Sequence, residues 1–171
     1  MTDSGANAGV ATGTLMAGKR GLIMGVANNR SIAWGIAKAA AAQGAEIALT
    51  YQGDALKKRV EPLAAELGSG IVLPCDVTDK VSMDAVFAEL KSAWGQMDFL
   101  VHAIAFAPRE ALKGEFYESV TRESFRMAHD ISSYSLAALA KAAAPLMQGR
   151  AGSVVTLSYL GAVRSIPRYN V

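Results

Sequence analysis

The sequence has 171 residues, of which 51% are hydrophobic and 19% charged, so the chain can bury the core of one ordinary domain. Its 17 basic and 15 acidic residues nearly cancel, which argues against nucleic acid or an anionic membrane surface as a partner. No apolar run reaches the length of about 18 residues that a membrane-spanning helix needs. The single cysteine, Cys75, excludes an internal disulfide and suits a reducing compartment, and two histidines are too few to suggest a zinc site.

The first 18 residues are rich in Gly, Ala and Thr and show no hydrophobic periodicity. This composition predicts a disordered leader over residues 1–18, followed by a single domain over residues 19–171. A basic start followed by an apolar run is missing, so the leader is not expected to be a secretory signal.

Short apolar segments alternate with helical patterns after the leader. Strands are predicted over residues 21–26, 46–51, 71–75, 98–102 and 153–157, and helices over residues 31–43, 54–67, 79–94 and about 123–147. The first helix is expected to bury Ile32, Ile36 and Ala40 on one face. This alternation predicts βαβ units, and hence a doubly wound parallel sheet in a three-layer α/β/α fold of the Rossmann type that stops after its fifth strand.

In such sheets a ligand binds beyond the carboxyl ends of the strands, where the strand order reverses, here between the first and fourth strands. Gly25 follows the first strand and can adopt backbone angles that are closed to other residues. Ser31 stands at the start of the next helix, where free amides and the helix dipole favour a diphosphate. The loop lacks the G-x-G-x-x-G pattern, so an ordinary turn with Ser31 as a helix cap stays open. Gly35 is expected to let this helix pack close to the sheet.

Polar side chains follow the second and third strands. The amide of Gln52 can bond a ribose or a base, and Asp76 can accept from an adenine amino group while the Val77 backbone donates. Asp76 could instead cap the following helix. Small residues after the fourth strand leave room for a flat ligand, with Ile104 packing against it.

Tyr159 and Tyr169 follow the fifth strand, ten residues apart. A phenol stays protonated at neutral pH and can donate a hydrogen bond to a developing oxyanion. Both tyrosines could equally be packing residues with an exposed hydroxyl. His102 and His129 are expected to be a strand-end residue and a helix residue without a catalytic role.

Six stretches together resemble the bacterial enoyl-[acyl-carrier-protein] reductases of the divergent short-chain dehydrogenase/reductase group. They are GVANNRSIAWGIA, LTYQGDALKKRVEPLA, CDVTD, DFLVHAIAFAP, HDISSYSLAALAKAA and VVTLSYLGAVRSIPRYNV. The resemblance runs from about Lys19 to Val171, with motif order and spacing in agreement throughout.

The resemblance implies a cytoplasmic homotetramer that uses NADH to reduce trans-2-enoyl thioesters on acyl carrier protein, the last reduction in a round of fatty-acid elongation. It implies that a substrate contact falls on Ala107, that no metal takes part, and that the dinucleotide contacts are Gly25, Ser31, Ile32, Gln52, Asp76, Val77 and Ile104. It also implies Tyr159 and Tyr169 as the two active-site tyrosines, with the Tyr169 hydroxyl holding an enolate after hydride reaches the β-carbon. Gln52, in place of a basic residue, favours NADH over NADPH.

The chain also departs from the family pattern. The family carries a lysine shortly after its second tyrosine, whereas only Asn170 and Val171 follow Tyr169, and Val163 stands where the family usually has an acid. We therefore expect these residues to be part of a longer enzyme, and expect this stretch alone to bind the adenosine half of NADH weakly and to turn over negligibly.

Three other functions are alternatives to a reductase of this family. A non-catalytic nucleotide-binding module remains open for this stretch of chain. A 3-oxoacyl reductase of the same superfamily would need a T-G-x-x-x-G-x-G turn and a Tyr-x-x-x-Lys motif, which the sequence lacks. A methyltransferase of Rossmann type is disfavoured, because its loop would lie differently relative to Asp76.

Overall fold

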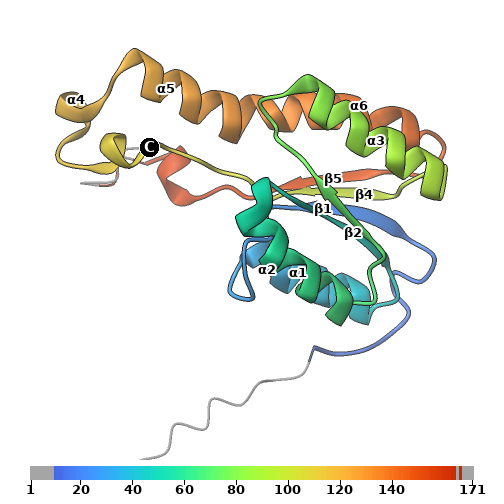
Figure 1. The fold of residues 1–171 in the computed structure, drawn as a ribbon. Coiled ribbons are helices and arrows are strands. Elements are labelled where there is room, and N and C mark those ends of the chain that lie inside the picture. The colour runs from blue at the N-terminus through green and yellow to red at the C-terminus, as the bar shows by residue number, and fades with distance from the viewer. Residues whose placement is uncertain (1–9, 165, 167–171) are drawn as a thin grey trace, which may run out of the picture.

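The computed structural model describes residues 10–164 and 166, and these form a parallel sheet covered by helices on both faces (Figure 1). The strands are β1 (Arg20–Met24), β2 (Glu46–Tyr51), β3 (Ile71–Pro74), β4 (Phe99–His102) and β5 (Ser153–Thr156). Their order in the sheet is β3-β2-β1-β4-β5, with every neighbouring pair parallel. The order reverses between β1 and β4, as the sequence predicts, and this position is where a doubly wound sheet opens a crevice.

The helices fall into two layers. One layer holds α1 (Ile32–Ala42) and α2 (Gly53–Glu66), and the opposite layer holds α3 (Lys80–Trp94) and α6 (Ser135–Met147) (Figure 1). The remaining elements are η1 (Arg109–Leu112), α4 (Phe116–Ser119), α5 (Arg122–His129), the π-helical turn η2 (Asp130–Tyr134) and η3 (Leu160–Ala162). The elements α4 and α5 extend past the carboxyl end of the sheet (Figure 1). The predicted three-layer fold is therefore confirmed.

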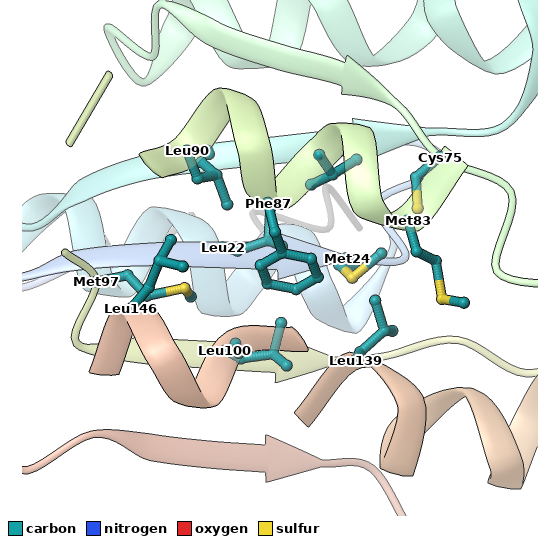
Figure 2. Packing of buried hydrophobic residues seen from close by; sticks show 13 residues of the cluster. Leu22, Met24, Cys75, Met83, Phe87, Leu90, Met97, Leu100, Leu139 and Leu146 are labelled. Carbon is teal, nitrogen blue, oxygen red and sulfur yellow. The ribbon is translucent and has the colours of Figure 1, made fainter. Parts of the chain in front are cut away.

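Two apolar clusters fill the space between these layers. On the α3 and α6 side, Leu22 and Leu100 of the sheet pack with Phe87, Leu90 and other residues of the cluster drawn in Figure 2. On the other side, Ile23 belongs to a second cluster that includes buried residues of α1 and α2. Successive residues of β1 point to opposite faces, and Leu22, Ile23 and Met24 are all apolar and buried, because a central parallel strand is covered on both sides.

The boundaries of the predicted strands and main helices lie within two residues of those in the structure. The predicted helix over residues 123–147 is a continuous helical segment, but the π-helical turn η2 divides it into α5 and α6. The three short elements η1, α4 and η3 were not predicted, because each is a single helical turn and too short to show a hydrophobic period.

The expected buried face of the first helix was partly wrong. The residues of α1 that are buried are Ala33, Trp34, Ala37 and Ala40, whereas Ile32 is 67% exposed. The large ring of Trp34 packs in the second cluster and sets the rotation of the helix, which turns Ile32 outward. Gly35 is exposed, and a methyl group added to it would meet no atom within 4 Å. Close packing against the sheet is therefore not the reason for a glycine at this position.

Residues 10–18 belong to the predicted leader and run beside the end of α1. The Gly13 and Met16 amides donate to the carbonyl oxygens of Ala42 and Gln43, both at 2.9 Å. The Met16 side chain packs against the second apolar cluster. The division of the chain into a leader and a domain at residue 19 stays a prediction.

The amino ends of the strands are tied by a buried carboxylate. Asp98, which is 5% exposed, accepts from Arg150 Nε and Nη2 at 3.1 and 2.9 Å, from the Arg20 amide at 3.0 Å and from Lys19 Nζ at 3.1 Å. Burial alone would raise the pKa of Asp98, but the hydrogen bonds from Arg150, Arg20 and Lys19 outweigh it and hold the pKa below its usual range. Asp98 thus joins the start of β1 to the segment that leads into β5.

The outer strand β5 is paired to β4 on one side, and its residues are exposed, including Val154 at 41% and Val155 at 46%. No helix in the part of the chain that the structure describes is long and apolar enough to cross a membrane.

Candidate functional site

A cavity of about 290 Å³ opens at the carboxyl ends of β1 to β4. Its wall comes from the last two residues of β2 and from the segments that follow these four strands, together with one residue each from α2 and η2. The lining residues are Gly25, Val26, Ala27, Thr50, Tyr51, Gln52, Leu56, Cys75, Asp76, Val77, Thr78, Ala103, Ile104, Ala105, Phe106 and Ile131. Five of the residues proposed from the sequence, Gly25, Gln52, Asp76, Val77 and Ile104, therefore share one wall.

Gly25 lies where β1 and β4 separate. Its φ of +99° falls in the region that favours glycine, and an added methyl carbon would lie 2.0 Å from the carbonyl oxygen of Ala103. The Ala103 amide in turn donates to the Met24 carbonyl at 3.2 Å. The two chain segments that leave these strands are thus in close contact. A glycine is required here because the φ angle is positive and because a side chain would collide with the Ala103 carbonyl.

Ser31 stands at the N-cap position of α1, but its side chain makes no capping bond. Its Oγ instead accepts from the amides of Ala27 and Asn28 at 3.0 and 3.1 Å, which closes the loop on itself. The Trp34 and Gly35 amides donate to the Ser31 carbonyl at 3.0 and 3.2 Å, whereas the Ile32 and Ala33 amides receive no capping side chain, and no acidic side chain occupies this turn. This helix end can therefore receive an anion. Ser31 and Ile32 are not among the cavity-lining residues and lie beside the loop that carries Ala27.

Asp76 is held by three donors in an orientation that leaves it facing the cavity. Its Oδ1 accepts from the Thr78 amide at 2.9 Å and the Thr78 hydroxyl at 2.7 Å, and its Oδ2 accepts from Gln52 Nε2 at 3.0 Å. The Thr78 bonds, assisted by Gln52, lower the pKa of Asp76, so the group is an ionised acceptor at neutral pH. Asp79, and not Asp76, caps α3 by accepting from the Val81 amide, which removes the alternative capping role.

Cys75 lines the same wall between Gln52 and Asp76. Burial, and secondly the negative charge of Asp76, raises its pKa to about 11, so the group is a protonated thiol at neutral pH. Among the described residues, no group of three or more His, Cys, Asp and Glu side chains could hold a metal ion.

The residues proposed at the far end are not brought into the cavity wall. Ala107 and Tyr159 are outside its lining, and Tyr159 is 43% exposed. The Tyr159 ring lies over Gly161, where an added methyl carbon would come within 2.2 Å of the ring and hydroxyl atoms. Tyr169 lies outside the described residues.

Several residues at the site were missed by sequence reasoning. Thr78 and Ser82 position Asp76, the latter by accepting from its amide at 2.9 Å, and Ser132 binds the backbone of Phe106. The spacing Asp-x-Thr is typical of a local side-chain turn and could have indicated Thr78. Ser132 is 26 residues from Phe106, and no local pattern points to their contact.

The two histidines, His102 and His129, lie outside the lining of the cavity. His102 is 1% exposed, with Nε2 at 2.8 Å from Ser135 Oγ and Nδ1 at 3.2 Å from Thr156 Oγ1. Burial lowers its pKa, so the ring is neutral. His129 stacks on Phe125 at the exposed side of α5.

Known proteins resemble this chain closely. The family model described as "Enoyl-(Acyl carrier protein) reductase" matches residues 25–171. An enoyl-[acyl-carrier-protein] reductase [NADH] of Rhizobium meliloti is 58% identical over 157 residues, which are 92% of this chain and 57% of that protein. The corresponding Escherichia coli protein is 54% identical over 156 residues, or 91% of this chain and 59% of its own length.

Solved structures give the same result. The reductase of Anaplasma phagocytophilum, crystallised in complex with NAD, superposes with a TM-score of 0.89 at 50% identity, covering 94% of this chain and 61% of that one. The Aquifex aeolicus enzyme superposes with a TM-score of 0.88 at 48% identity, covering 91% and 61%. This chain thus spans about three fifths of the length of the proteins that it matches. Because the family model matches residues 25–171, which are most of the chain, the chain belongs to the enoyl-(acyl carrier protein) reductase family.

Proposed function

We propose that the protein binds NADH along the carboxyl edge of its sheet and reduces trans-2-enoyl thioesters carried on acyl carrier protein. The observation that carries the proposal is the cavity that unites Gly25, Gln52, Asp76, Val77 and Ile104 in a chain of this family. The relatives that the chain matches are named as NADH-dependent enoyl-[acyl-carrier-protein] reductases, and one was crystallised with NAD.

The adenosine half of the dinucleotide fits between the ends of β2 and β3. Asp76 Oδ2 has capacity for a second donor besides Gln52 Nε2, and an adenine amino group can supply it. The backbone amide of Val77 can donate to the same base. Because Gln52 Nε2 is engaged by Asp76, its carbonyl oxygen is left to accept from a ribose hydroxyl, and the nearby carboxylate disfavours a phosphate there. This arrangement supports NADH over NADPH.

The diphosphate fits at the start of α1. The missing side chain at Gly25 lets a ligand approach the backbone, and the first-turn amides of Ile32 and Ala33 lie at the end of the helix that carries partial positive charge. Ser31 contributes by closing the loop through Ala27 and Asn28, which keeps those amides in place.

The nicotinamide half extends toward β4 and β5. Bound NADH supplies a hydride to the β-carbon of the enoyl group. Ile104 packs along this end of the cavity and excludes water, Ala107 contacts the acyl chain, and Tyr159 and Tyr169 donate hydrogen bonds that hold the enolate oxygen, with Tyr169 in direct contact. The roles of Ala107, Tyr159 and Tyr169 are supported by their match to the family's motif. The same resemblance supports a homotetramer acting in the cytoplasm.

The proposal is tested by titrating the full-length gene product with NADH and by following NADH oxidation with a crotonyl thioester of acyl carrier protein. Wild-type protein should bind NADH and turn over. Tyr169→Phe should lower kcat by about a hundredfold or more while the Kd for NADH changes little, because the lost donor acts only in the transition state.

The matched control is Tyr117→Phe, which removes the hydroxyl of a tyrosine that is 76% exposed on α4 and should leave both quantities unchanged. NADH binding without turnover in the wild-type protein would favour a non-catalytic nucleotide-binding module. Absence of NADH binding would refute the proposal outright.

A further inference from the structure

The helix over the carboxyl edge contains a π-helical turn next to the cavity. Residues Asp130–Tyr134 interrupt the helical segment between α5 and α6, and the flanking residues His129 and Ser135 keep α-helical angles. Such turns are rare and are found mostly as single turns, often at functional sites. Here the turn presents Ile131 to the cavity wall and places Ser132 beside the loop that follows β4.

The Ser132 hydroxyl binds both backbone groups, the amide and the carbonyl, of one residue in this loop, Phe106. The Phe106 amide donates to Ser132 Oγ at 3.0 Å, and the Ser132 hydroxyl donates to the Phe106 carbonyl at 3.2 Å. The loop that follows β4 supplies four consecutive lining residues, Ala103 to Phe106, and therefore includes Ile104. One hydroxyl therefore satisfies a donor and an acceptor of a loop that has no secondary structure between β4 and η1.

A second set of bonds holds the π-helical turn itself against the sheet. The Ser135 hydroxyl donates to the Ile131 carbonyl at 2.6 Å and lies 2.8 Å from His102 Nε2. Because the Ser135 proton is directed to Ile131, Nε2 of the neutral ring is the donor to Ser135. The other ring nitrogen lies 3.2 Å from Thr156 Oγ1, at the end of β5. The turn that carries Ser132 is thus anchored to the ends of both β4 and β5.

We infer that Ser132 is a positioning residue: through Phe106 it holds the loop after β4, and with it Ile104, at the spacing that the nicotinamide end of the bound dinucleotide requires. The inference rests on the proposed function for its effect on turnover. The hydrogen bonds themselves do not depend on the reaction, so they can be tested separately. The proposed adenosine contacts, Gln52 and Asp76, follow β2 and β3, so a shift of this loop should not change their positions.

The experiment compares Ser132→Ala with Ser133→Ala in the full-length gene product. Ser133 belongs to the same π-helical turn, and its side chain is exposed, so its loss is a matched control. Ser132→Ala should lower kcat by about tenfold, since small misplacements of reacting groups are costly, while the Kd for NADH changes by less than about twofold. Ser133→Ala should match wild type in both, and Ser132→Thr, which keeps the hydroxyl, should retain most of kcat.

Amide hydrogen exchange gives a readout that is independent of activity. In Ser132→Ala the segment around Phe106 should exchange about tenfold faster, because its amide loses its acceptor, while exchange in β1 and β2 stays unchanged. An unchanged kcat with faster exchange would overturn the inference, as would unchanged exchange or a Kd for NADH that rises as much as kcat falls. A Ser132→Ala protein that fails to fold would also overturn it, because the serine would then act on global stability. Lack of turnover in the wild type would count against the proposed function, with the exchange result still deciding whether Ser132 holds the loop.

Discussion

The cavity wall that follows β1, β2 and β3 is held differently from the wall that follows β4. In the first, most of the bonds that fix polar groups come from neighbours a few residues away, as at Ser31 from Ala27 and at Asp76 from Thr78, and the bond from Gln52 to Asp76 is the exception. In the second, the ties span long stretches of chain, as between Phe106 and Ser132 or His102 and Thr156. The comparison teaches that the wall proposed to hold the adenosine is set mainly by local turn chemistry, whereas the wall proposed to hold the nicotinamide depends on how the later helices pack.

The largest loss of NADH affinity is expected at Gly25, where the segments that follow β1 and β4 are in contact. Gly25→Ala would force a side chain onto a residue with φ of +99° and into contact with the Ala103 carbonyl, 2.0 Å away. Strain of this kind costs about 1–3 kcal/mol, so NADH should bind about tenfold to a hundredfold more weakly by fluorescence titration. Gly35→Ala is the control, because an added methyl group there meets no atom within 4 Å. Equal affinities for the two variants would mean that the contact at Gly25 does not shape the site.

The amino edge should affect stability without affecting either wall. Asp98→Asn leaves Arg150 and Lys19 without their carboxylate partner and should lower the free energy of unfolding by about 2 kcal/mol in urea, with the Kd for NADH unchanged. Since the folded-state pKa of Asp98 is lowered, its stabilisation is present above the unfolded pKa of about 4 and is lost as the pH falls through the folded value. The difference between wild type and variant should therefore shrink below about pH 4.

Asp84→Asn removes a carboxylate in an exposed pair with Lys80 and serves as the control for that stability measurement. It should cost less than about 0.5 kcal/mol. A loss as large as that of Asp98→Asn would show that burial of the carboxylate is not what matters.

The adenosine wall can be weakened selectively through its carboxylate. Asp76→Asn removes an ionised acceptor, so NADH should bind about tenfold more weakly by calorimetry, while kcat at saturating NADH stays near that of wild type. The expected effect is confined to binding because Asp76 lies at the end of β3, away from the reacting atoms. A large fall in kcat would contradict the division of the cavity into two differently held walls.

At the wall proposed to hold the nicotinamide, a substitution should lower turnover and leave the affinity for NADH unchanged, which is the reverse of the result expected for Asp76→Asn. Gly161→Ala would place a methyl carbon 2.2 Å from atoms of the Tyr159 ring and must displace it. Turnover should fall by about threefold to tenfold with the Kd for NADH unchanged. Gly70→Ala, whose added methyl group meets nothing within 4 Å, should leave turnover at the wild-type level in the same steady-state assay.

The thiol of Cys75 is expected to react slowly with alkylating reagents. With its pKa raised to about 11 by burial and then by Asp76, it should label with iodoacetamide at pH 7.5 far more slowly than the free amino acid. Labelling kinetics followed by mass spectrometry test this. Rapid labelling in the folded protein would mean that the cavity wall opens at β3.

Much of the fold and the adenosine wall could be predicted from the sequence because both depend on local patterns. Apolar runs ending in Gly25, or just before Gln52 and Asp76, mark strand ends, and the strand order places those ends together. The rotation of α1 could not be predicted, because the packing of Trp34 decides which side of an alanine-rich helix is buried. The capping role left open for Ser31 depended on a side-chain torsion that no pattern encodes.

The reactive wall could be predicted only in part. Ile104 lines the cavity, and its role as a cofactor contact stays a prediction. The hydrogen bonds between Ser132 and Phe106 join residues 26 positions apart and follow from the packing of one helix on the sheet, so no local pattern predicts them. The roles proposed for Tyr159 and Tyr169 come from the match to the family's motif, and Tyr169 lies outside the described residues.

The extra residue in the π-helical turn shifts the phase between α5 and α6. An α-helix advances about 100° per residue, so α6 is rotated by about this amount from where an uninterrupted helix would present its side chains. The apolar and hydroxyl side chains that α6 turns inward, Ser135, Leu139, Ala143 and Leu146, owe their inward orientation to that offset. Winding this turn as a regular α-helix with all of its residues kept would rotate α6 by that amount and turn these side chains away from the sheet, whereas deleting the one extra residue would join α5 and α6 into a regular helix with both inward faces kept.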